Sequence, residues 1–132
     1  MLVVDDRDAD RQALVAALDG TPYESVTAAT GNEALRCLLR EEFAIVLLDV
    51  LLPDVNGLEV ARLMREHEPT RYTPILFLSA AGVDMAFVHK TYRGGPMDYL
   101  AKPVERGTLL STMQLLLELA EIETAARGAA DA

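Results

Sequence analysis

The chain has 132 residues and a formal net charge of −9 at pH 7, from 21 acidic residues against 12 lysines and arginines. This length suits one compact domain, and the acidic balance argues against direct nucleic-acid binding, which needs a basic surface. It is compatible with a metal cation or a basic protein surface as a partner. No apolar stretch reaches the ~18 residues of a membrane span and no secretion signal precedes the first predicted strand, so we expect a cytoplasmic protein without membrane contact.

The first half of the chain alternates predicted strands and helices. It opens with Leu2–Val4, an apolar run typical of a strand that is buried on both faces. A helix is predicted to begin after a cap at Asp8 and to stop at Gly20. The half-polar run Ser25–Ala28 fits a strand at the edge of a sheet. Thr30–Glu33 then matches the capping box that begins a second helix.

The second half continues this alternation. Ala44–Leu48 and Ile75–Leu78 predict two further buried strands, and Tyr99–Ala101 predicts a weaker one. A helix with apolar residues at a spacing of three to four follows Asn56–Gly57. Asp84–Tyr92 predicts a weak helix with few strong apolar positions. Strands that alternate with helices predict βαβ units and an α/β fold, in which a doubly wound parallel sheet has helices on both faces.

A long helix is predicted from Glu105 to about Ala126. We expect a domain over residues 1–120, followed by a helix extension or linker tail over residues 121–132. The extension is predicted either to lead into a following module or to contact a second copy of the chain. Two sets of apolar and spacing residues are expected along this helix. The residues expected to face the sheet are Leu109, Leu110, Met113 and Leu117, and those expected to continue the spacing beyond it are Leu116, Leu119, Ala120 and Glu123.

A polar residue stands at the end of each buried strand. Asp5 and Asp6 follow the first, and Asp49, Ser79 and Lys102 follow the next three. The ligand sites of open parallel sheets lie just outside the carboxyl ends of the strands, so these side chains are expected to converge. An acidic pair alone is more often a turn or a cap, and a serine alone is more often a helix cap. All of these residues together, each on a strand end, favour a functional site.

The predicted site has the components of phosphoryl transfer. Three neighbouring carboxylates either have raised pKa values or share a cation, and oxygen ligands favour Mg²⁺ or Mn²⁺. Lys102 can neutralise charge on a phosphoryl oxygen, and Ser79 can donate a hydrogen bond to one. Phosphoryl transfer depends mostly on such positioning and charge stabilisation. The carboxylate of Asp49 is therefore a candidate nucleophile that would form an acyl phosphate.

These residues resemble the receiver domains of two-component response regulators over about Leu2 to Leu119. Asp5-Asp6 resembles the acidic pair that ends the first strand of the family. Asp49–Gly57 resembles its D-x-x-[ML]-P-x-[ML]-x-G phosphoacceptor segment. Ser79-Ala80 resembles its Ser/Thr-Ala pair, and Tyr99–Pro103 resembles its aromatic-x-x-Lys-Pro segment. Four motifs in this order and at these separations are highly specific.

The resemblance implies a flavodoxin-like sheet with strand order 2-1-3-4-5 and a Mg²⁺-dependent reaction. Asp49 would accept a phosphoryl group from the phosphohistidine of a histidine kinase or phosphotransfer protein. Asp6, Asp49 and the backbone carbonyl of Leu51 would bind the metal directly, and Asp5 would hold a metal-bound water. Lys102 would contact the phosphoryl group.

The resemblance also implies a switch and its setting. Ser79 and Tyr99 would form the switch pair, and the Lys102–Pro103 peptide bond would be cis. The chain would act as a signalling domain and not as a conventional enzyme, and it would regulate a fused or separate output domain. It would contact neither nucleic acid nor membrane directly, and it could form a homodimer through the C-terminal helix region. A stand-alone protein, a domain of a hybrid kinase and a domain of a larger regulator all remain open.

Two other functions fit parts of the pattern. A metal-dependent phosphatase would also use an aspartate nucleophile, but it usually carries a second acid two residues later, where this chain has Leu51, which cannot transfer a proton. A scaffold domain with the same fold usually lacks an acid or the lysine, and here none is lost. Dinucleotide and P-loop motifs are absent from the sequence. The switch function is therefore favoured.

Overall fold

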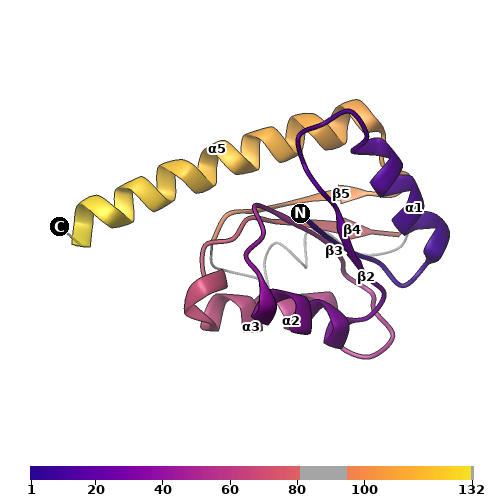
Figure 1. The fold of residues 1–132 in the computed structure, drawn as a ribbon, viewed down its shortest axis with the longest axis horizontal. Helices are drawn as coiled ribbons and strands as arrows, with labels where there is room; N and C mark the ends of the chain where they lie inside the picture. The colour runs from indigo at the N-terminus through magenta and orange to yellow at the C-terminus, as the bar shows by residue number, and fades with distance from the viewer. Residues whose placement is uncertain (81–94, 132) are drawn as a thin grey trace.

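The computed structural model describes residues 1–80 and 95–131. It contains a five-stranded parallel sheet with helices on both faces, in the strand order β2-β1-β3-β4-β5 (Figure 1). This confirms the predicted α/β fold and strand order, with the half-polar second strand at an edge. The strands are β1 (Leu2–Val4), β2 (Val26–Ala28), β3 (Val46–Asp49), β4 (Ile75–Ser79) and β5 (Met97–Ala101).

The helices alternate with these strands along the chain. The weak helix predicted at Asp84–Tyr92 lies outside the described residues. The helices of the described part are α1 (Asp8–Ala17), α2 (Gly31–Arg40), α3 (Gly57–Glu66), the short 3₁₀ helix η1 (Glu68–Thr70) and α5 (Arg106–Asp131).

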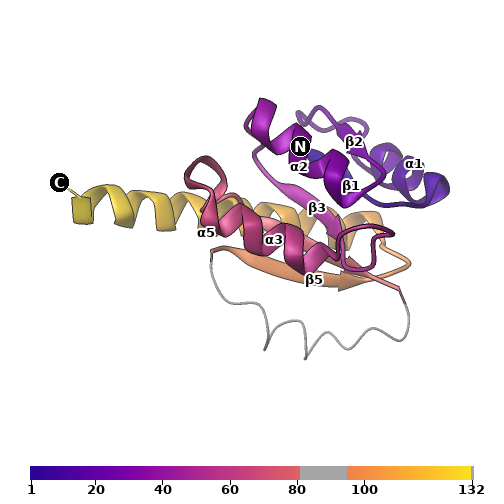
Figure 2. The same cartoon turned by 90° about the horizontal axis from the view of Figure 1, so that it is seen from below.

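The sheet is buried on both faces, which explains the consecutive apolar residues in its strands. α1 and α5 cover one face, and α2 and α3 cover the other (Figures 1 and 2). Because successive side chains of a strand point to opposite faces, Val3 packs in the core beneath α1 and α5, whereas Leu2 and Val4 pack beneath α2 and α3. Leu76 and Phe77 divide between the two faces in the same way.

The register aligns the carboxyl ends of the strands at one edge. Val4 of β1 pairs with Leu48 of β3, one residue before Asp49. Further along the sheet, Ser79 at the end of β4 pairs with Ala101, one residue before Lys102. The polar residues that follow the apolar runs therefore lie at the same edge, as the sequence predicted.

The helix caps follow the sequence in one case and depart from it in another. At α2 the Thr30 hydroxyl accepts from the Glu33 N–H at 3.0 Å, and the Glu33 carboxylate accepts from the Ala29 N–H at 3.1 Å. The first bond confirms that Thr30 caps the helix as predicted, but the second reaches the residue before the cap, and not the Thr30 N–H that a capping box would use. The predicted cap at Asp8 is wrong, because Arg7 holds the cap position without a side-chain hydrogen bond. Asp8 is the first residue of α1, and its carboxylate accepts from Arg11 and Gln12, one turn further along the helix.

The last helix is longer than predicted. α5 continues to Asp131, and its C-terminal part projects beyond the sheet (Figure 1). Leu109 and Met113 are buried against the sheet as expected. Leu116 was expected to lie beyond the sheet, but it is 1% exposed, because Leu109, Met113 and Leu116 recur at a spacing of four and then three and so share one face of the helix. In the part of the chain that the structure describes, no helix has both the length and the apolar character needed to cross a membrane.

Candidate functional site

The first carboxylates of the site stand where β1 ends. Asp5 is completely buried, and its Oδ1 accepts a hydrogen bond from the backbone N–H of Arg7 at 3.0 Å. The guanidinium of Arg11 in α1 donates to the Asp5 carbonyl at 2.8 Å. The next residue, Asp6, is exposed. This strand end therefore presents one fixed, buried carboxylate and one that faces solvent.

The third carboxylate stands where β3 ends. Asp49 is 5% exposed, and its Oδ1 accepts from the Leu51 N–H at 3.1 Å. Gly57 begins α3 so close by that a Cβ on it would lie 2.2 Å from the Asp49 carbonyl oxygen. The Gly57 N–H also donates to the Val50 carbonyl at 2.9 Å. A glycine at this position therefore lets α3 pack directly against the strand end that carries Asp49.

The three carboxylates form one cluster. Oxygens of Asp5, Asp6 and Asp49 all lie within 4.8 Å of one another. Such an all-oxygen set suits a hard divalent cation, which would relieve the repulsion between the acids. The exposed side of the cluster, at Asp6, leaves room for the waters that Mg²⁺ usually retains. The residues present therefore fit a magnesium or manganese ion.

An ammonium group completes the site from β5. The Lys102 Nζ lies 2.5 Å from Asp5 Oδ2, 3.1 Å from Asp49 Oδ2 and 3.1 Å from Asp10 Oδ2. The backbone N–H of Lys102 donates to the Ser79 carbonyl at 2.8 Å, which places it at the end of β4. The Lys102–Pro103 peptide bond is cis, as the resemblance implied. The structure thus joins residues 97 positions apart in the sequence into one ion-pair network.

The response regulator receiver domain is the family whose model matches residues 1–114 of this chain. The chain belongs to this family. The receiver is 32% identical over 124 residues to the transcriptional regulatory protein SrrA of Staphylococcus aureus. That match covers 94% of the receiver and 50% of SrrA, so the chain spans about half the length of the curated relatives it matches.

Solved structures agree with this assignment. The receiver superposes on the chemotaxis protein CheY4 of Vibrio cholerae with a TM-score of 0.78 and 32% identity, over 87% of this chain and 95% of that one. It superposes equally well, with a TM-score of 0.78 and 28% identity, on the receiver domain of the sensor histidine kinase PA1611 from Pseudomonas aeruginosa. That match covers 89% of this chain and 95% of the other, whose active-site cleft coordinates a magnesium ion.

Burial and ion pairing change the pKa values of the two central ionisable groups of the receiver, Asp49 and Lys102. Burial raises the pKa of Asp49 above its ordinary value, and the hydrogen bonds from Leu51 and Lys102 only partly oppose this. Burial also disfavours the charged form of Lys102, but the hydrogen bonds to Asp5, Asp10 and Asp49 together outweigh it and raise the pKa of Lys102. The lysine therefore stays charged, and a proton competes for Asp49 at a higher pH than for an ordinary carboxylate.

The two predicted switch residues lie on neighbouring strands. Ser79 is the last residue of β4 and is buried, whereas Tyr99 in β5 is 36% exposed. Tyr99 pairs with Phe77, and Ser79 pairs with Ala101. Because side chains two residues apart on a strand share a face, Ser79 and Tyr99 lie on the same face of the sheet as diagonal neighbours.

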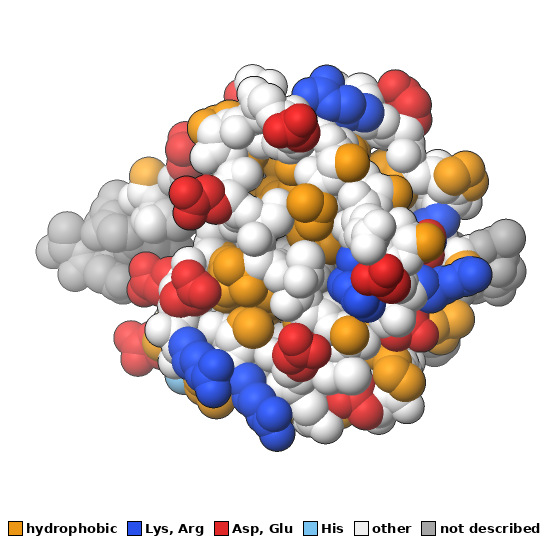
Figure 3. Space-filling model, turned by 45° about the vertical axis from the view of Figure 1, so that its right-hand side comes forward, with side chains coloured by type: hydrophobic (Ala, Val, Ile, Leu, Met, Phe, Trp, Pro, Cys, Tyr) orange, Lys and Arg blue, Asp and Glu red, His pale blue; other side chains and the backbone are white. Residues whose placement is uncertain are grey.

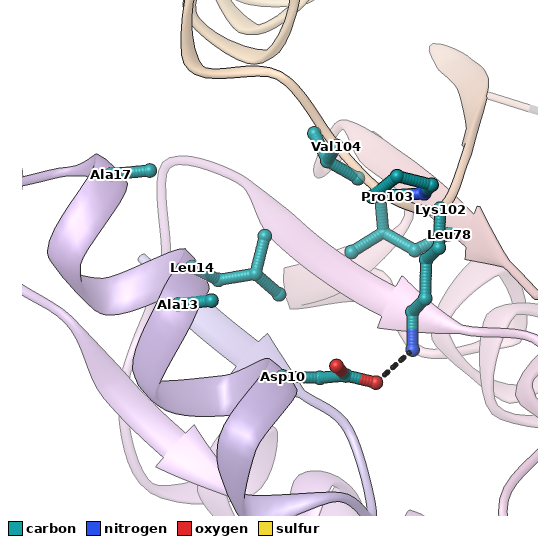
Figure 4. A pocket seen from close by; sticks show the side chains of 8 residues that line it. All are labelled: Asp10, Ala13, Leu14, Ala17, Leu78, Lys102, Pro103 and Val104. Atoms are coloured by element: carbon teal, nitrogen blue, oxygen red, sulfur yellow. Dashed lines mark hydrogen bonds and ion pairs between the residues drawn. The ribbon is translucent and has the colours of Figure 1, made fainter.

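Sequence reasoning missed Asp10 as a member of the site. Its carboxylate is the third partner of Lys102, and it comes from α1 and not from a strand end (Figure 4). α1 begins at Asp8, two residues after the acidic pair, so its first turn lies near the edge of the sheet that carries the site. That proximity could have suggested that an acid in the first turn reaches the site.

Asp54 has a structural role that the motif did not reveal. Its two carboxylate oxygens accept from the Gly31 and Asn32 N–H groups at 2.8 and 3.0 Å. These are the first N–H groups of α2, which a helix itself leaves unpaired. The loop that follows Asp49 is thereby attached to the neighbouring helix. The hydrogen bond from Asn32 is the main reason that the pKa of Asp54 is lowered.

The surface agrees with the charge balance of the sequence. On the face drawn in Figure 3, acidic side chains are spread widely, and the basic side chains stand in small separate groups. This distribution differs from the continuous basic surface that duplex binding needs.

Proposed function

We propose that this receiver accepts a phosphoryl group on Asp49 from the phosphohistidine of a histidine kinase or a phosphotransfer protein. The observation that carries the proposal is the convergence on Asp49 of two further carboxylates, within 4.8 Å, and of the Lys102 ammonium, at 3.1 Å. An oxygen of Asp49 would attack phosphorus, and the bond from phosphorus to the donor imidazole nitrogen would break. The leaving imidazole keeps the electron pair, and the product is an acyl phosphate.

The same cluster would hold Mg²⁺, or Mn²⁺ in its place. We assign Asp6, Asp49 and the Leu51 carbonyl as direct ligands, and Asp5 as the residue that holds a metal-bound water. The all-oxygen donor set supports this assignment, as does the magnesium ion in the cleft of the related PA1611 receiver domain. A bound divalent cation would neutralise charge on the phosphoryl oxygens.

The protein groups around Asp49 would stabilise the transferred group. Lys102 would donate to one phosphoryl oxygen and Ser79 to another. Movement of Ser79 toward the phosphoryl group would open space for the ring of Tyr99, which would change the surface around β5. The diagonal placement of these two residues on one face of the sheet supports this coupling.

The receiver would regulate an output domain or partner that lies outside residues 1–132. We propose that the domain ends near residue 120 and that residues 121–132 form an extension, of which residues 121–131 are the end of α5. The C-terminal half of α5, from the end of the domain into the start of this extension, carries an exposed stripe of Leu115, Leu119 and Ile122, which are 52%, 46% and 66% exposed and recur at a spacing of four and then three. This spacing is that of a coiled-coil seam, so we propose that the stripe contacts a second copy. A cytoplasmic location follows from a kinase partner of this kind.

Phosphorylation with a small-molecule donor tests the proposed function. The protein is incubated with acetyl phosphate and Mg²⁺, and its intact mass and the sensitivity of the adduct to hydroxylamine are measured. The native chain is expected to gain one hydroxylamine-sensitive phosphoryl group, and Asp49→Asn none. Asp54→Asn removes a charge from the same loop without touching the cluster and is expected to retain the adduct. An adduct on Asp49→Asn would contradict the proposal.

A further inference from the structure

Asp10 contacts the catalytic lysine but lies outside the metal-binding cluster. Its Oδ2 lies 3.1 Å from the Lys102 Nζ, and its side chain is 35% exposed, against 0% for Asp5 and 7% for Asp49 (Figure 4). The three acids whose oxygens gather within 4.8 Å are Asp5, Asp6 and Asp49. Lys102 is therefore shared between two carboxylates of that cluster and a third that belongs to α1.

The three contacts account for every donor of the lysine. An ammonium group has three N–H donors and no acceptor, and three carboxylates lie within 3.1 Å of the Lys102 Nζ. A phosphoryl oxygen can therefore be bound by Lys102 only if one of these carboxylates gives up its N–H. A divalent cation at the cluster would weaken the ion pairs of Lys102 with Asp5 and Asp49, because the cation would partly neutralise the charge of these two carboxylates. It would leave the contact with Asp10 intact.

The structure gives Lys102 room on the side of α1. A pocket of about 140 Å³ lies beside its side chain, between α1 and the segment after β5. The apolar part of this pocket would not replace the hydrogen bonds of the ammonium, so Asp10 is the group that can retain the lysine there. The pocket is lined by Asp10, Ala13, Leu14, Ala17, Leu78, Lys102, Pro103 and Val104 (Figure 4).

We propose that Asp10 is a positioning residue that holds Lys102 on the α1 side of the site and so slows its movement onto the phosphoryl group. The inference rests on the proposed phosphorylation of Asp49 and adds a residue that sets its rate. The exposure of Asp10 keeps this hold weak enough to be broken, because partly solvated ion pairs contribute little net free energy. Asp10 thus acts through Lys102, without contact with the phosphoryl group.

Rates of phosphorylation by acetyl phosphate at saturating Mg²⁺ and constant ionic strength test this inference. Asp10→Asn is expected to accelerate phosphorylation about two- to fivefold, the range that corresponds to the loss of one partly exposed ion pair. Asp10→Glu keeps a carboxylate within reach of Lys102 and is expected to restore a rate near the native one. Asp8→Asn removes the same charge from the same helix turn, but Asp8 pairs with Arg11, so its effect is expected to stay below about twofold.

A double-mutant cycle distinguishes the contact from the charge. In the Lys102→Ala background, Asp10→Asn is expected to change the rate no more than Asp8→Asn does, because the partner of Asp10 is gone. Equal acceleration by Asp10→Asn with and without Lys102, or no acceleration beyond that of Asp8→Asn in the native background, would overturn the inference while native phosphorylation stands. A native chain that gains no phosphoryl group would overturn the proposed function and this inference with it.

The ammonium itself provides a readout that does not depend on phosphorylation. The chain has two lysines, Lys90 and Lys102, so the Nζ resonance of Lys102 can be assigned by comparison with Lys102→Arg. In the presence of Mg²⁺, Asp10→Asn is expected to speed exchange of the Lys102 ammonium protons with water, and Asp8→Asn to leave it unchanged. Unchanged exchange in Asp10→Asn would show that Asp10 does not hold the lysine and would overturn the inference.

Discussion

At the scale of single residues, repulsion among three carboxylates of the site is partly offset by their attraction to one lysine. The carboxylates of Asp5, Asp6 and Asp49 repel one another, and Lys102 offsets this repulsion only for the two that it contacts. Asp6 faces solvent and has no such contact with Lys102. The cluster is therefore expected to bind cations, and its stability is expected to depend on them.

Divalent metal is expected to stabilise the fold, because it binds the assembled carboxylates and not the unfolded chain. At 100 times the dissociation constant, the free energy of unfolding should rise by about 2.7 kcal/mol. Thermal melting with Mg²⁺ and with EDTA measures this. Asp6→Ala should no longer melt at a higher temperature when Mg²⁺ is added. In EDTA, Asp6→Ala should melt at a higher temperature than the native chain, because its side chain no longer repels Asp5 and Asp49. Equal melting temperatures of the native chain at saturating Mg²⁺ and in EDTA would argue against the site.

Metal affinity is expected to rise with pH. A protonated Asp49 cannot bind a cation, and burial raises the pKa of this carboxyl. Proton competition should therefore persist above the ordinary carboxyl pKa of about 3.9 and fade as the pH rises through the higher folded pKa. Calorimetric titration of Mg²⁺ across this range measures the affinity, and an affinity that does not change with pH would contradict the expectation.

At the scale of elements, the loop between β3 and α3 links the site to two helices. Gly57 allows α3 to approach the Asp49 backbone, and Asp54 pairs with the first N–H groups of α2. A change at either residue therefore acts on the fold through backbone contacts. The two effects can be measured separately, because the effect at Gly57 is steric and the effect at Asp54 depends on the charge of its carboxylate.

Gly57→Ala is expected to destabilise the fold. Its Cβ would lie 2.2 Å from the Asp49 carbonyl oxygen and 3.0 Å from the Val50 Cα, and backbone atoms cannot turn aside. Overpacking of this kind typically lowers the free energy of unfolding by about 1–3 kcal/mol. Denaturant unfolding of Gly57→Ala and of the native chain measures the difference. Gly107→Ala is the control, since its Cβ would meet the end of the Glu105 side chain and not backbone atoms. Equal stability of Gly57→Ala and the native chain would contradict the steric argument.

Asp54 is expected to stabilise the fold in a pH-dependent way. Its folded pKa is lowered, first by the Asn32 N–H, so its contribution is present above the unfolded carboxyl pKa of about 3.9 and is lost as the pH falls through the folded value. Asp54→Asn should therefore melt below the native chain at pH 7, and the difference should shrink in acid. Asp19→Asn, which removes an exposed carboxylate at the end of α1, controls for charge. A difference that does not change with pH would exclude the carboxylate as its cause.

At the scale of the whole molecule, α5 is the helix that extends past the sheet (Figure 1). Its N-terminal part contributes Leu109, Met113 and Leu116 to the core. Its C-terminal part projects away from the sheet (Figure 2) and exposes apolar side chains. An extension of this kind has to be stabilised by something other than the core of the domain, because isolated helices of a few turns are marginal in water.

The exposed stripe of Leu115, Leu119 and Ile122, together with the extension after it, is expected to promote self-association. Sedimentation of the intact chain with beryllofluoride, a phosphoryl mimic, should show a dimer, and a chain truncated after Leu117 should remain monomeric. Leu119→Glu should weaken the dimer because it places a charge in the exposed stripe, whereas Gln114→Glu makes the same change in charge elsewhere on the helix. A monomer under all conditions would remove the dimer contact and leave α5 as a linker.

The sequence by itself determined the fold and most of the site. Short runs of consecutive apolar residues are typical of strands buried on both faces, and their alternation with helices predicts parallel strands. Parallel strands end at one edge, so the residues after each run had to meet there. For this reason the convergence of Asp5, Asp49 and Lys102 could be predicted before their distances were known.

Only the tertiary structure decided the contacts that local pattern does not encode. Asp10 reaches Lys102 across 92 positions of sequence, and Asp54 reaches the first N–H groups of α2 across 23 and 22 positions. Neither pairing follows from periodicity, because each depends on how a helix or loop packs over the edge of the sheet. Local pattern selects the elements and their order, whereas the side chains that meet between elements are selected by packing, which minimises voids and unpaired polar groups over the whole molecule.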